Sequence, residues 1–338
     1  MKKIKVIQIG IGHDHAMPIL NCMLKQSDIF EVAALAVPES EKKDFADRVE
    51  IYQKKLPVMT IDETFAIADI DAAVIETEEE NLTKYAYMAA EKGLPVHMDK
   101  PGGLNLNEFE KLINLAQENR TVFHIGYMYR YNKSIAEAIR KAKSGELGEV
   151  YCVEAHMDCW HIAEKRQWLA HFPGGMTFYL GCHLIDIILQ VMGEPEKIIP
   201  MNMSTGIDGV TGKDYGFVIF KYKNGVSFAK TCAKELGGFE RRQLVICGSK
   251  GTIELRPLEE YENEDDLHTG TRFIADNDKG RNWHYIAPVI NSGAADRYDG
   301  MMSSFAKMVR GEITNPYSYD YELKLYKMLL RSCGAKID

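Results

Sequence analysis

The sequence predicts an α/β domain followed by an α+β domain, and three observations lead to that prediction. The chain has 338 residues, more than the roughly 250 residues at which a single core usually stops growing. Short apolar runs alternate with helical periodicity up to about residue 125, a pattern typical of βαβ units and a parallel sheet. Beyond that point extended segments follow one another, which indicates a large, mostly antiparallel open sheet. We therefore predict domains at 1–125 and 126–338.

Within the first domain, apolar runs predict strands and the periodic segments between them predict helices. Strands are expected at 4–9, 30–37, 72–77, 95–98 and 121–126, and helices after Asp14 and at 40–50, 81–92 and 104–119. Helices of this length between strands would cover both faces of a parallel sheet.

The second domain begins with a predicted helix at 134–144 and then turns to long strands. These are expected at 149–159, 197–204, 214–222, 226–235 and 241–247, with a hairpin turn at Asn224-Gly225. A helix at 181–192 is apolar almost all round, so it should be buried. Two amphipathic helices close the chain, and we expect them to pack back on the first domain. One sheet face has no evident covering helix, which predicts a homodimer or homotetramer assembled through it.

Composition and charge exclude several classes of function. Acidic residues outnumber basic ones by 49 to 41, giving a net charge of -8, whereas nucleic-acid binders need a basic excess. The apolar runs fall short of the roughly 20 residues that span a bilayer, and the amino terminus does not resemble a signal peptide. Seven cysteines without a Cys-x-x-Cys pair favour a reducing compartment. We expect a cytoplasmic protein without nucleic-acid or membrane partners. The acidic run 259–266 is expected to be a solvated loop.

A glycine turn follows the first predicted strand and precedes the first helix. Gly10 and Gly12 stand where a dinucleotide-binding fold needs glycines for a tight turn and for close approach of the pyrophosphate. His15 takes the place of the usual third glycine. We expect His13, Asp14 and His15 to contact phosphate or cap the helix. In this context the turn predicts NAD or NADP, although a lone Gly-x-Gly is often only a turn.

The acidic residue that normally binds the ribose should follow the second strand about 20 residues later. Val37 occupies that place, and Glu39 follows two residues on. Because a carboxylate at Glu39 would repel a 2′-phosphate, the sequence favours NAD over NADP.

Two further motifs carry groups that transfer protons. Asp99 and Lys100 come directly after a predicted strand, at the sheet edge where ligands bind. A lysine in a Pro-Gly turn is also a common surface feature. Residues 174–186 lead from glycines into the buried helix, with His183 in its first turn and Asp186 three residues later, on the same face. Asp186 could orient the imidazole, or His183 could be a buried polar group satisfied by its surroundings.

Together these motifs resemble the Gfo/Idh/MocA family of glucose-fructose oxidoreductase and inositol dehydrogenase-like proteins. The glycine turn, Asp-Lys-Pro at 99–101, Gly-Tyr-x-Tyr-Arg-Tyr-Asn at 126–132 and the segment 174–186 occur in the family's order. The resemblance covers essentially the full length. It implies a Rossmann domain, a second domain with an open sheet, and NAD(P)-dependent oxidation or reduction of a sugar, cyclitol or related polyol.

The resemblance also assigns residues. Lys100 matches the family's catalytic lysine and His183 its catalytic histidine, whereas Tyr179 stands where an aspartate is common. Thr77 and Glu78 take the place of a Thr-Pro-Asn-like turn beside the nicotinamide. The predicted cofactor set is therefore Gly10, Gly12, His13, Asp14, His15, Val37, Glu39, Thr77, Glu78, Asp99 and Lys100. The predicted substrate set is Tyr179, His156, Trp168, Arg130 and Asp186.

Three functions remain open from the sequence. The first is an NAD(P)-dependent dehydrogenase in which His183 is the base and Lys100 stabilises the alkoxide. The second is a lyase or hydrolase that oxidises its substrate only transiently, and the third is a non-catalytic nucleotide-binding sensor or partner protein. A metal at His156, Asp158 and His183 lacks any local ligand signature, so no metal site is expected.

Overall fold

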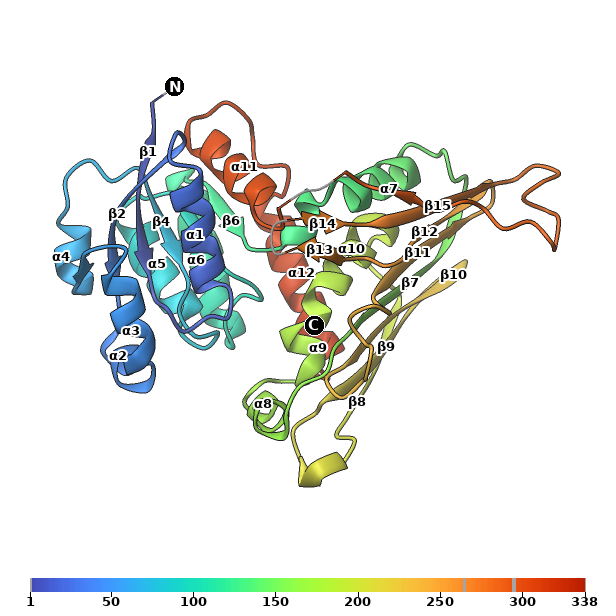
Figure 1. Ribbon diagram of the computed structural model, residues 1–338, viewed down its shortest axis with the longest axis horizontal. Coiled ribbons are helices and arrows are strands. Elements are labelled where there is room, and N and C mark those ends of the chain that lie inside the picture. The colour runs from blue at the N-terminus through green and yellow to red at the C-terminus, as the bar shows by residue number, and fades with distance from the viewer. Residues whose placement is uncertain (1, 264–265, 294–295, 338) are drawn as a thin grey trace. The chain divides into compact units, whose positions relative to one another are not determined.

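The computed structural model describes residues 2–263, 266–293 and 296–337, which form two compact units (Figure 1). The first unit comprises the chain up to residue 128 together with residues 298–326. The second comprises residues 129–297 and the chain from residue 327 onward. In the described part of the chain, no helix combines the length and the apolar character needed to cross a membrane.

A six-stranded parallel sheet forms the centre of the first unit. Its strands are β1 (Ile4–Ile9), β2 (Phe30–Ala36), β3 (Val58–Met59), β4 (Ala72–Ile75), β5 (Val96–Met98) and β6 (Phe123–Ile125). Their order is β3-β2-β1-β4-β5-β6, with every pairing parallel. This is the doubly wound order of a Rossmann fold, with its topological switch point between β1 and β4. The predicted fold of the first domain is confirmed.

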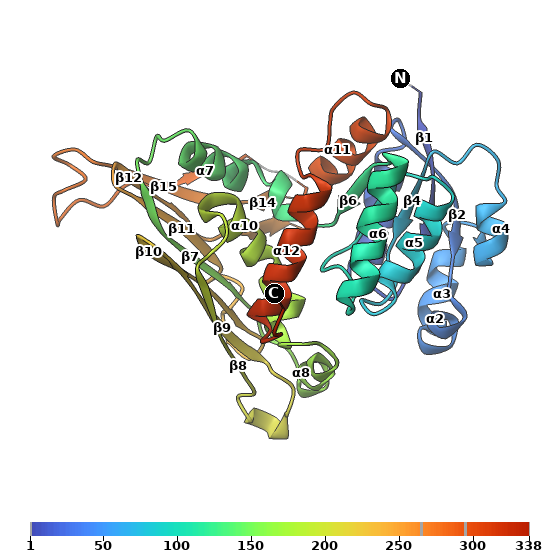
Figure 2. The ribbon, with the colours of Figure 1, turned by 180° about the vertical axis from the view of Figure 1, so that it is seen from behind.

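Helices cover both faces of this sheet. They are α1 (Ala16–Lys25), α2 (Glu39–Asp44), α3 (Ala46–Gln53), α4 (Ile61–Phe65), α5 (Leu82–Glu91) and α6 (Leu106–Asn119). Figures 1 and 2 show α5 and α6 side by side on one face and α1 on the other. The single helix predicted at 40–50 is wrong, because Phe45 has non-helical backbone angles and separates α2 from α3.

Residues 298–326 complete the first unit. Helix α11 (Asp299–Val309) packs on α1, and α12 (Tyr319–Ser332) follows it. The Asn315 side chain donates to the Phe123 carbonyl at 2.7 Å, beside strand β6. The Tyr326 hydroxyl donates to the Gly103 carbonyl at 3.0 Å. These bonds attach the returning segment to the loops at the sheet.

The second unit contains an eight-stranded mixed sheet. Its strands are β7 (Val150–Asp158), β8 (Lys197–Met203), β9 (Tyr215–Tyr222), β10 (Gly225–Cys232), β11 (Gln243–Gly248), β12 (Gly251–Leu255), β15 (Gly270–Ala275) and β16 (Ile290–Asn291). They run in the order β16-β15-β12-β11-β7-β10-β9-β8, and only β7 and β10 pair in parallel. Antiparallel pairing of β9 with β10 confirms the predicted hairpin. The mostly antiparallel sheet is also confirmed.

Three helices of this unit lie against one face of its sheet (Figure 2): α7 (Lys133–Lys143), α9 (Met176–Tyr179) and α10 (Gly181–Met192). Helix α8 (Ala163–Trp168) contacts the 3₁₀ turn Leu169–His171 that follows it, and further 3₁₀ turns lie at Met128–Tyr131 and Ile207–Gly209. Helix α10 packs on β7 and β10, and its apolar side chains are buried as predicted. Val153, Ala155 and Ala229 are buried on this helix-covered face. Since successive strand residues alternate between faces, the intervening side chains occupy the other face.

The acidic run 259–266 is not simply a solvated loop. Glu259 is buried, and its carboxylate bonds Arg242 at 2.8 Å and Arg297 at 2.7 Å. Residues on either side of 264–265 form β13 (Glu260–Asn263) and β14 (Asp266–His268), while 264–265 themselves lie outside the described residues. Two arginines compensate the buried charge at Glu259. The acidic residues around it in the sequence could not reveal these distant partners.

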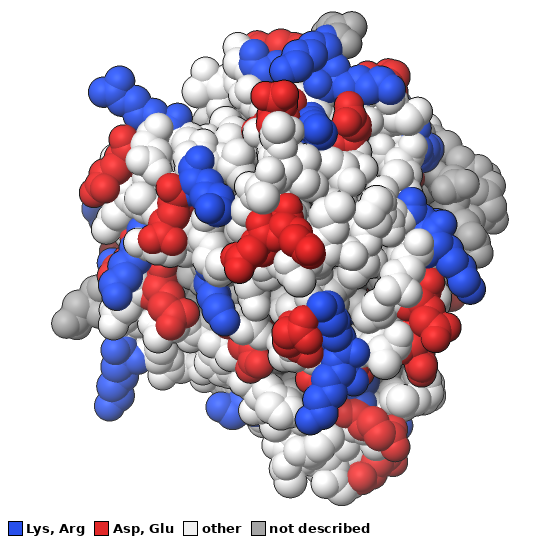
Figure 3. Space-filling model, turned by 90° about the vertical axis from the view of Figure 1, so that its left-hand side faces the viewer, with Lys and Arg blue, Asp and Glu red and all other residues white. Residues whose placement is uncertain are grey.

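The face of the molecule in Figure 3 shows acidic and basic side chains interspersed.

Candidate functional site

The glycine turn of the first unit is shaped by the chain that crosses it. Gly10 has φ of +95°, and a Cβ there would lie 2.4 Å from the Thr77 backbone nitrogen. A Cβ on Gly12 would lie 2.5 Å from the Glu78 side chain. Both glycines are therefore required by the close approach of residues 77–78, whatever the turn binds.

The backbone amides of this turn hold a carboxylate from the same chain. The Glu41 carboxylate accepts from the N–H groups of Ile11 at 2.6 Å, Gly12 at 3.1 Å and Glu78 at 2.9 Å. Glu41 is fully buried, and burial raises its pKa to about 7 although the three amide bonds oppose the shift. The turn is thus an anion-binding site, and Glu41 fills it.

Sequence reasoning missed Glu41 and selected its neighbours instead. Val37 is buried, and Glu39 is 83% exposed with its carboxylate paired to Lys42 at 2.5 Å. Helix α2 begins at Glu39, so the residue two positions later faces the turn. The missed signal was an acidic residue in the first turn of a helix that directly follows β2.

The glycine turn fits the pyrophosphate of a dinucleotide in chemical terms. Phosphate oxygens, like those of Glu41, accept hydrogen bonds from clustered backbone amides. Two other amides of the turn already have partners, since His13 N–H donates to the Glu76 carbonyl and His15 N–H to His13 Nδ1. A bound pyrophosphate would therefore use the amides that Glu41 now occupies, after that side chain has moved.

Next to the turn lies a buried group that we call the histidine–carboxylate cluster: His13, His15, Glu76, His97 and Asp99. Asp99 Oδ2 lies 3.0 Å from His15 Nδ1 and 3.2 Å from His13 Nδ1. Burial lowers the pKa of His15 to about 4, which keeps its imidazole neutral. Burial alone would raise the pKa of Asp99, but the two adjacent imidazoles outweigh it and hold that pKa well below its usual range.

Glu76 and His97 extend this cluster into the sheet. Glu76 Oε2 lies 3.9 Å from His13 Nδ1, and Glu76 Oε1 lies 3.8 Å from His97 Nε2. His97 Nδ1 is 2.6 Å from His124 Nδ1 on the adjacent strand. Burial raises the pKa of Glu76 and lowers that of His97 to about 4. Sequence reasoning missed these residues because each lies at or within a short apolar strand, where a polar side chain gave no functional signal.

Lys100 is buried immediately after β5, with only 1% of its surface exposed. Its backbone N–H donates to Asp99 Oδ1 at 2.6 Å. The following turn is fixed by three hydroxyl donors to successive carbonyls: Tyr127 to Pro101, Thr83 to Gly102 and Tyr326 to Gly103. The alternative of an exposed lysine in a Pro-Gly turn is excluded. Of the other predicted cofactor residues, Thr77 is buried beside the turn and Asp14 is exposed.

His183 lies in the first turn of α10 in the second unit. Its ring is buried and meets the Tyr129 ring edge-on, with centroids 5.2 Å apart. Asp186, one candidate for orienting this imidazole, accepts hydrogen bonds from Arg130, at 3.0 Å from Nε and 2.9 Å from Nη2. Both side chains are buried, and in this bidentate ion pair each compensates the charge of the other. Contact of Arg130 or Asp186 with substrate stays a prediction from the sequence.

Trp168 and Tyr179 lie together in an aromatic group with Phe172. The Tyr179 ring stands perpendicular to that of Trp168 at 5.3 Å and parallel to that of Phe172 at 6.2 Å. The Lys165 ammonium sits 3.7 Å from the centre of the Trp168 ring. Aromatic faces beside a cation offer both stacking and hydrogen bonding to a polar ligand.

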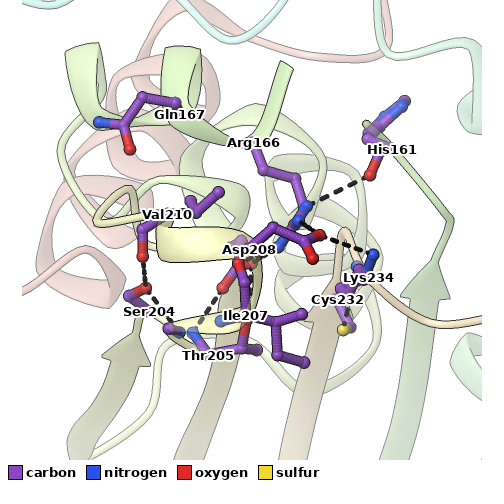
Figure 4. A network of polar contacts seen from close by, with 12 residues as sticks. His161, Arg166, Gln167, Ser204, Thr205, Ile207, Asp208, Val210, Cys232 and Lys234 are labelled. Carbon is purple, nitrogen blue, oxygen red and sulfur yellow. Dashed lines mark hydrogen bonds and ion pairs between the residues drawn. The ribbon is translucent and has the colours of Figure 1, made fainter. Parts of the chain in front are cut away.

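A network around Arg166 fixes the helix that carries Trp168 (Figure 4). The buried Arg166 guanidinium bonds the His161 carbonyl at 3.2 Å and Asp214 at 2.9 Å, and it pairs with Asp208. Lys234 reaches the same Asp208 carboxylate at 2.8 Å. Helix α8 is thereby tied to residues 205–214, which gives Trp168 a rigid support.

His156 belongs to the other face of the second sheet. Its neighbours Ala155 and Met157 are buried on the helix-covered face, so His156 points away from α10. Its ring instead packs edge-on against Phe228 at 5.5 Å. Burial, assisted by Lys230 and Arg241, lowers the pKa of His156 to about 4. Alternation along β7 separates it from His183, and we do not retain it as a substrate residue.

Comparison with known proteins identifies the family. Residues 4–127 match the oxidoreductase family with an NAD-binding Rossmann fold, and residues 135–254 match the GFO/IDH/MocA C-terminal domain. The oxidoreductase YhhX of Escherichia coli is 27% identical over 192 residues, covering 56% of this chain and 54% of that protein. The scyllo-inositol 2-dehydrogenase (NAD(+)) of Bacillus subtilis is 30% identical over 125 residues, covering 37% and 36%. The chain thus spans about half the length of the curated relatives it matches first.

Solved structures share the whole fold. UDP-N-acetylglucosamine 3-dehydrogenase GnnA from Acidithiobacillus ferrooxidans superposes with a TM-score of 0.76 at 17% identity, over 98% of this chain and 97% of that one. An oxidoreductase from Thermotoga maritima gives 0.73 at 18% identity, over 98% and 96%. Both family matches and the strand order of the first sheet lead to one assignment. The chain belongs to the Gfo/Idh/MocA family of oxidoreductases.

Proposed function

We propose that this protein is an NAD-dependent oxidoreductase acting on a hydroxyl or carbonyl carbon of a sugar, cyclitol or related polyol. The observation that carries the proposal is the pairing of two features at the carboxyl ends of the Rossmann strands. One is a glycine turn whose amides bind an anion, and the other is the buried Lys100. NAD is proposed over NADP because the acidic Glu39, which follows β2, would repel a 2′-phosphate.

The nicotinamide, when bound, accepts or returns a hydride at the substrate carbon. The protein must then move the hydroxyl proton. We assign His183 as the base, because a neutral imidazole can accept the hydroxyl proton and histidine is the side chain that most often does so. Lys100 stabilises the negative charge that develops on the substrate oxygen. Its burial strengthens this interaction, because charges attract more strongly away from water.

The aromatic group in the second unit supports a polyol substrate. The Trp168 ring offers apolar contact to a sugar, and the Lys165 ammonium, 3.7 Å from the centre of that ring, offers a hydrogen-bond donor beside it. We propose that the Tyr179 hydroxyl binds a substrate hydroxyl. A phenol can donate such a bond, but it is a poor replacement for an ionised carboxylate at pH 7. Tyr179 therefore contributes to binding and His183 to chemistry.

The proposal is tested by measuring NADH formation with a panel of sugars and cyclitols. We expect His183→Ala to lower turnover by about two to four orders of magnitude with nearly unchanged NAD affinity. Lys100→Met should also reduce turnover, and the double variant should lose less than the product of the two effects if both act on one oxygen. Full turnover by His183→Ala would remove it as the base, and full turnover by both single variants would exclude the dehydrogenase.

A second candidate is a lyase or hydrolase that oxidises the substrate only transiently. It is favoured by the similarity to 2,7-anhydro-N-acetylneuraminate hydratase of Mediterraneibacter gnavus, which is 21% identical over 262 residues, covering 75% of this chain and 68% of that protein. Such an enzyme yields product without net NADH, and its NAD copurifies. Native mass spectrometry of the purified protein, followed by product analysis without added NAD, separates the two candidates. Nucleotide binding without any turnover would instead support a sensor.

A further inference from the structure

The histidine–carboxylate cluster lies where open α/β sheets bind ligands. His13 and His15 come from the turn after β1, Glu76 directly follows β4, and Asp99 directly follows β5. These positions are the carboxyl ends of neighbouring strands on both sides of the switch point between β1 and β4. Three separate segments thus converge on one buried place in the first unit.

The donor atoms of the cluster have the spacing of metal ligands. One ring nitrogen each of His13 and His15 and one Asp99 oxygen all lie within 4.8 Å of one another. The two nitrogen–oxygen distances to Asp99 are 3.2 and 3.0 Å. Ligand atoms about 2.0–2.1 Å from a tetrahedral ion lie roughly 3.3 Å apart. The three groups could therefore bind one ion once His13 Nδ1 releases the His15 N–H, from which it accepts a hydrogen bond at 3.1 Å.

Unsatisfied polar atoms beside these donors provide an independent observation. Glu76 is completely buried, and neither of its carboxylate oxygens has a hydrogen-bond partner among the described residues. Nε2 of His13 and Nε2 of His97 are also buried and lack a hydrogen-bond partner among the described residues. Glu79, also buried, brings a further oxygen to 3.8 Å from His13 Nε2. Buried polar atoms need partners, and a bound cation would provide one for the Glu76 oxygens and would favour the ionised form of this carboxyl group.

We propose that His13, His15 and Asp99 bind a divalent transition-metal ion, with Glu76 as a fourth ligand or as the acceptor that orients the histidines. Two imidazoles and a carboxylate suit zinc, iron(II), cobalt(II) or manganese(II) better than calcium or magnesium, which prefer oxygen ligands. Of the three proposed ligands, only His15 reaches the surface, with 14% of its side chain exposed. The inference goes beyond the proposed function and does not rest on it.

The site is tested on tag-free, full-length protein. Elemental analysis first measures the metal content of the protein as isolated. The metal is then removed with a chelator, and the binding of Zn²⁺ or Co²⁺ to the metal-free protein is followed by titration calorimetry. We expect one ion per chain, and Co²⁺ should give the visible absorption of a site with nitrogen ligands. His15→Ala and Asp99→Asn should each weaken binding at least tenfold. His284→Ala removes an exposed histidine from the second unit and serves as the matched control.

Two results would overturn the proposal: no stoichiometric binding of either ion by the wild-type chain, or equal binding by the wild type, His15→Ala and Asp99→Asn. Asp99→Asn keeps the shape of the side chain, and circular dichroism of each variant shows whether it folds. A Zn²⁺-dependent rise in melting temperature in the wild type and in His284→Ala, absent in the two ligand variants, would support the site without reference to enzymatic activity.

Discussion

Replacing Glu41 tests whether the glycine turn is free to bind a dinucleotide. The Glu41 carboxylate occupies amides of Ile11, Gly12 and Glu78 through three hydrogen bonds. A bound pyrophosphate must displace it, and each bond contributes about 0.5–1.5 kcal/mol net. The total is about 1.5–4.5 kcal/mol, so Glu41→Ala should tighten NAD binding by between about tenfold and about a thousandfold.

The assay is titration calorimetry at pH 8, with NADH and inorganic pyrophosphate as separate ligands. Glu39→Ala is the matched control, because it removes the same charge from the same helix at an exposed position. It should leave both affinities within about twofold of the wild type. Weaker NADH binding by Glu41→Ala would refute the reasoning and assign Glu41 to the ribose hydroxyls. Unchanged binding would mean that the dinucleotide does not use these amides.

The raised pKa of Glu41 adds a pH dependence. Its pKa is about 7 in the folded chain against 4.5 for an ordinary glutamate side chain, so the native state binds more protons than the unfolded state between these values. The contribution of Glu41 to stability is therefore present below about pH 4.5 and is lost as pH rises toward 7. The loss amounts to about 3 kcal/mol. Chemical denaturation across this range should show it in the wild type and not in Glu41→Gln, while NADH binding by the wild type should strengthen from pH 8 to pH 6.

Three further predictions concern the second unit. Arg130→Met should destabilise the protein by about 3–5 kcal/mol in urea denaturation, since it leaves Asp186 buried and uncompensated, and a loss below about 1 kcal/mol would contradict the buried ion pair. Tyr179→Phe should raise KM for the polyol with little change in kcat, whereas a matching fall in kcat would place the hydroxyl in the chemical step. Met201→Glu, on the uncovered sheet face where Met201 is 40% exposed, should convert the proposed homo-oligomer to monomers in light scattering, and an unchanged mass would exclude assembly through that face.

The sequence was most informative where a local pattern determined the structure. The run Ile4–Ile9 is a buried strand because its apolar residues suit a sheet covered on both faces, and the turn at Asn224 joins β9 to β10 because its residues favour a hairpin. Strand β3 has only two residues and no such pattern. The break at Phe45 also lacked a glycine or proline to mark it.

The candidate site was predictable in its position but not in its contacts. The glycine turn, Asp99 and Lys100 could be placed at one sheet edge because parallel strands end together. Which acidic side chain lies in the glycine turn depends on how α2 is oriented, because that orientation directs Glu41 toward the turn. This is a tertiary feature that the local sequence does not contain. The Arg130–Asp186 pair likewise joins residues 56 positions apart. Spacing on α10 instead suggested that Asp186 could orient His183. The Arg130 guanidinium, although distant in sequence, offers two donors that match the Asp186 carboxylate and binds it.

The return of residues 298–326 to the first unit has a consequence for synthesis of the chain. The surface of α1 that contacts α11 stays uncovered until that segment has been made, about 170 residues after β6. At about 5–20 residues per second, the wait is roughly 10–30 s. During that interval the nascent Rossmann sheet exposes apolar surface near the ribosome while the second unit is being translated. A chaperone that binds such surface would have its greatest effect on residues 1–128, although they are synthesised before the second unit.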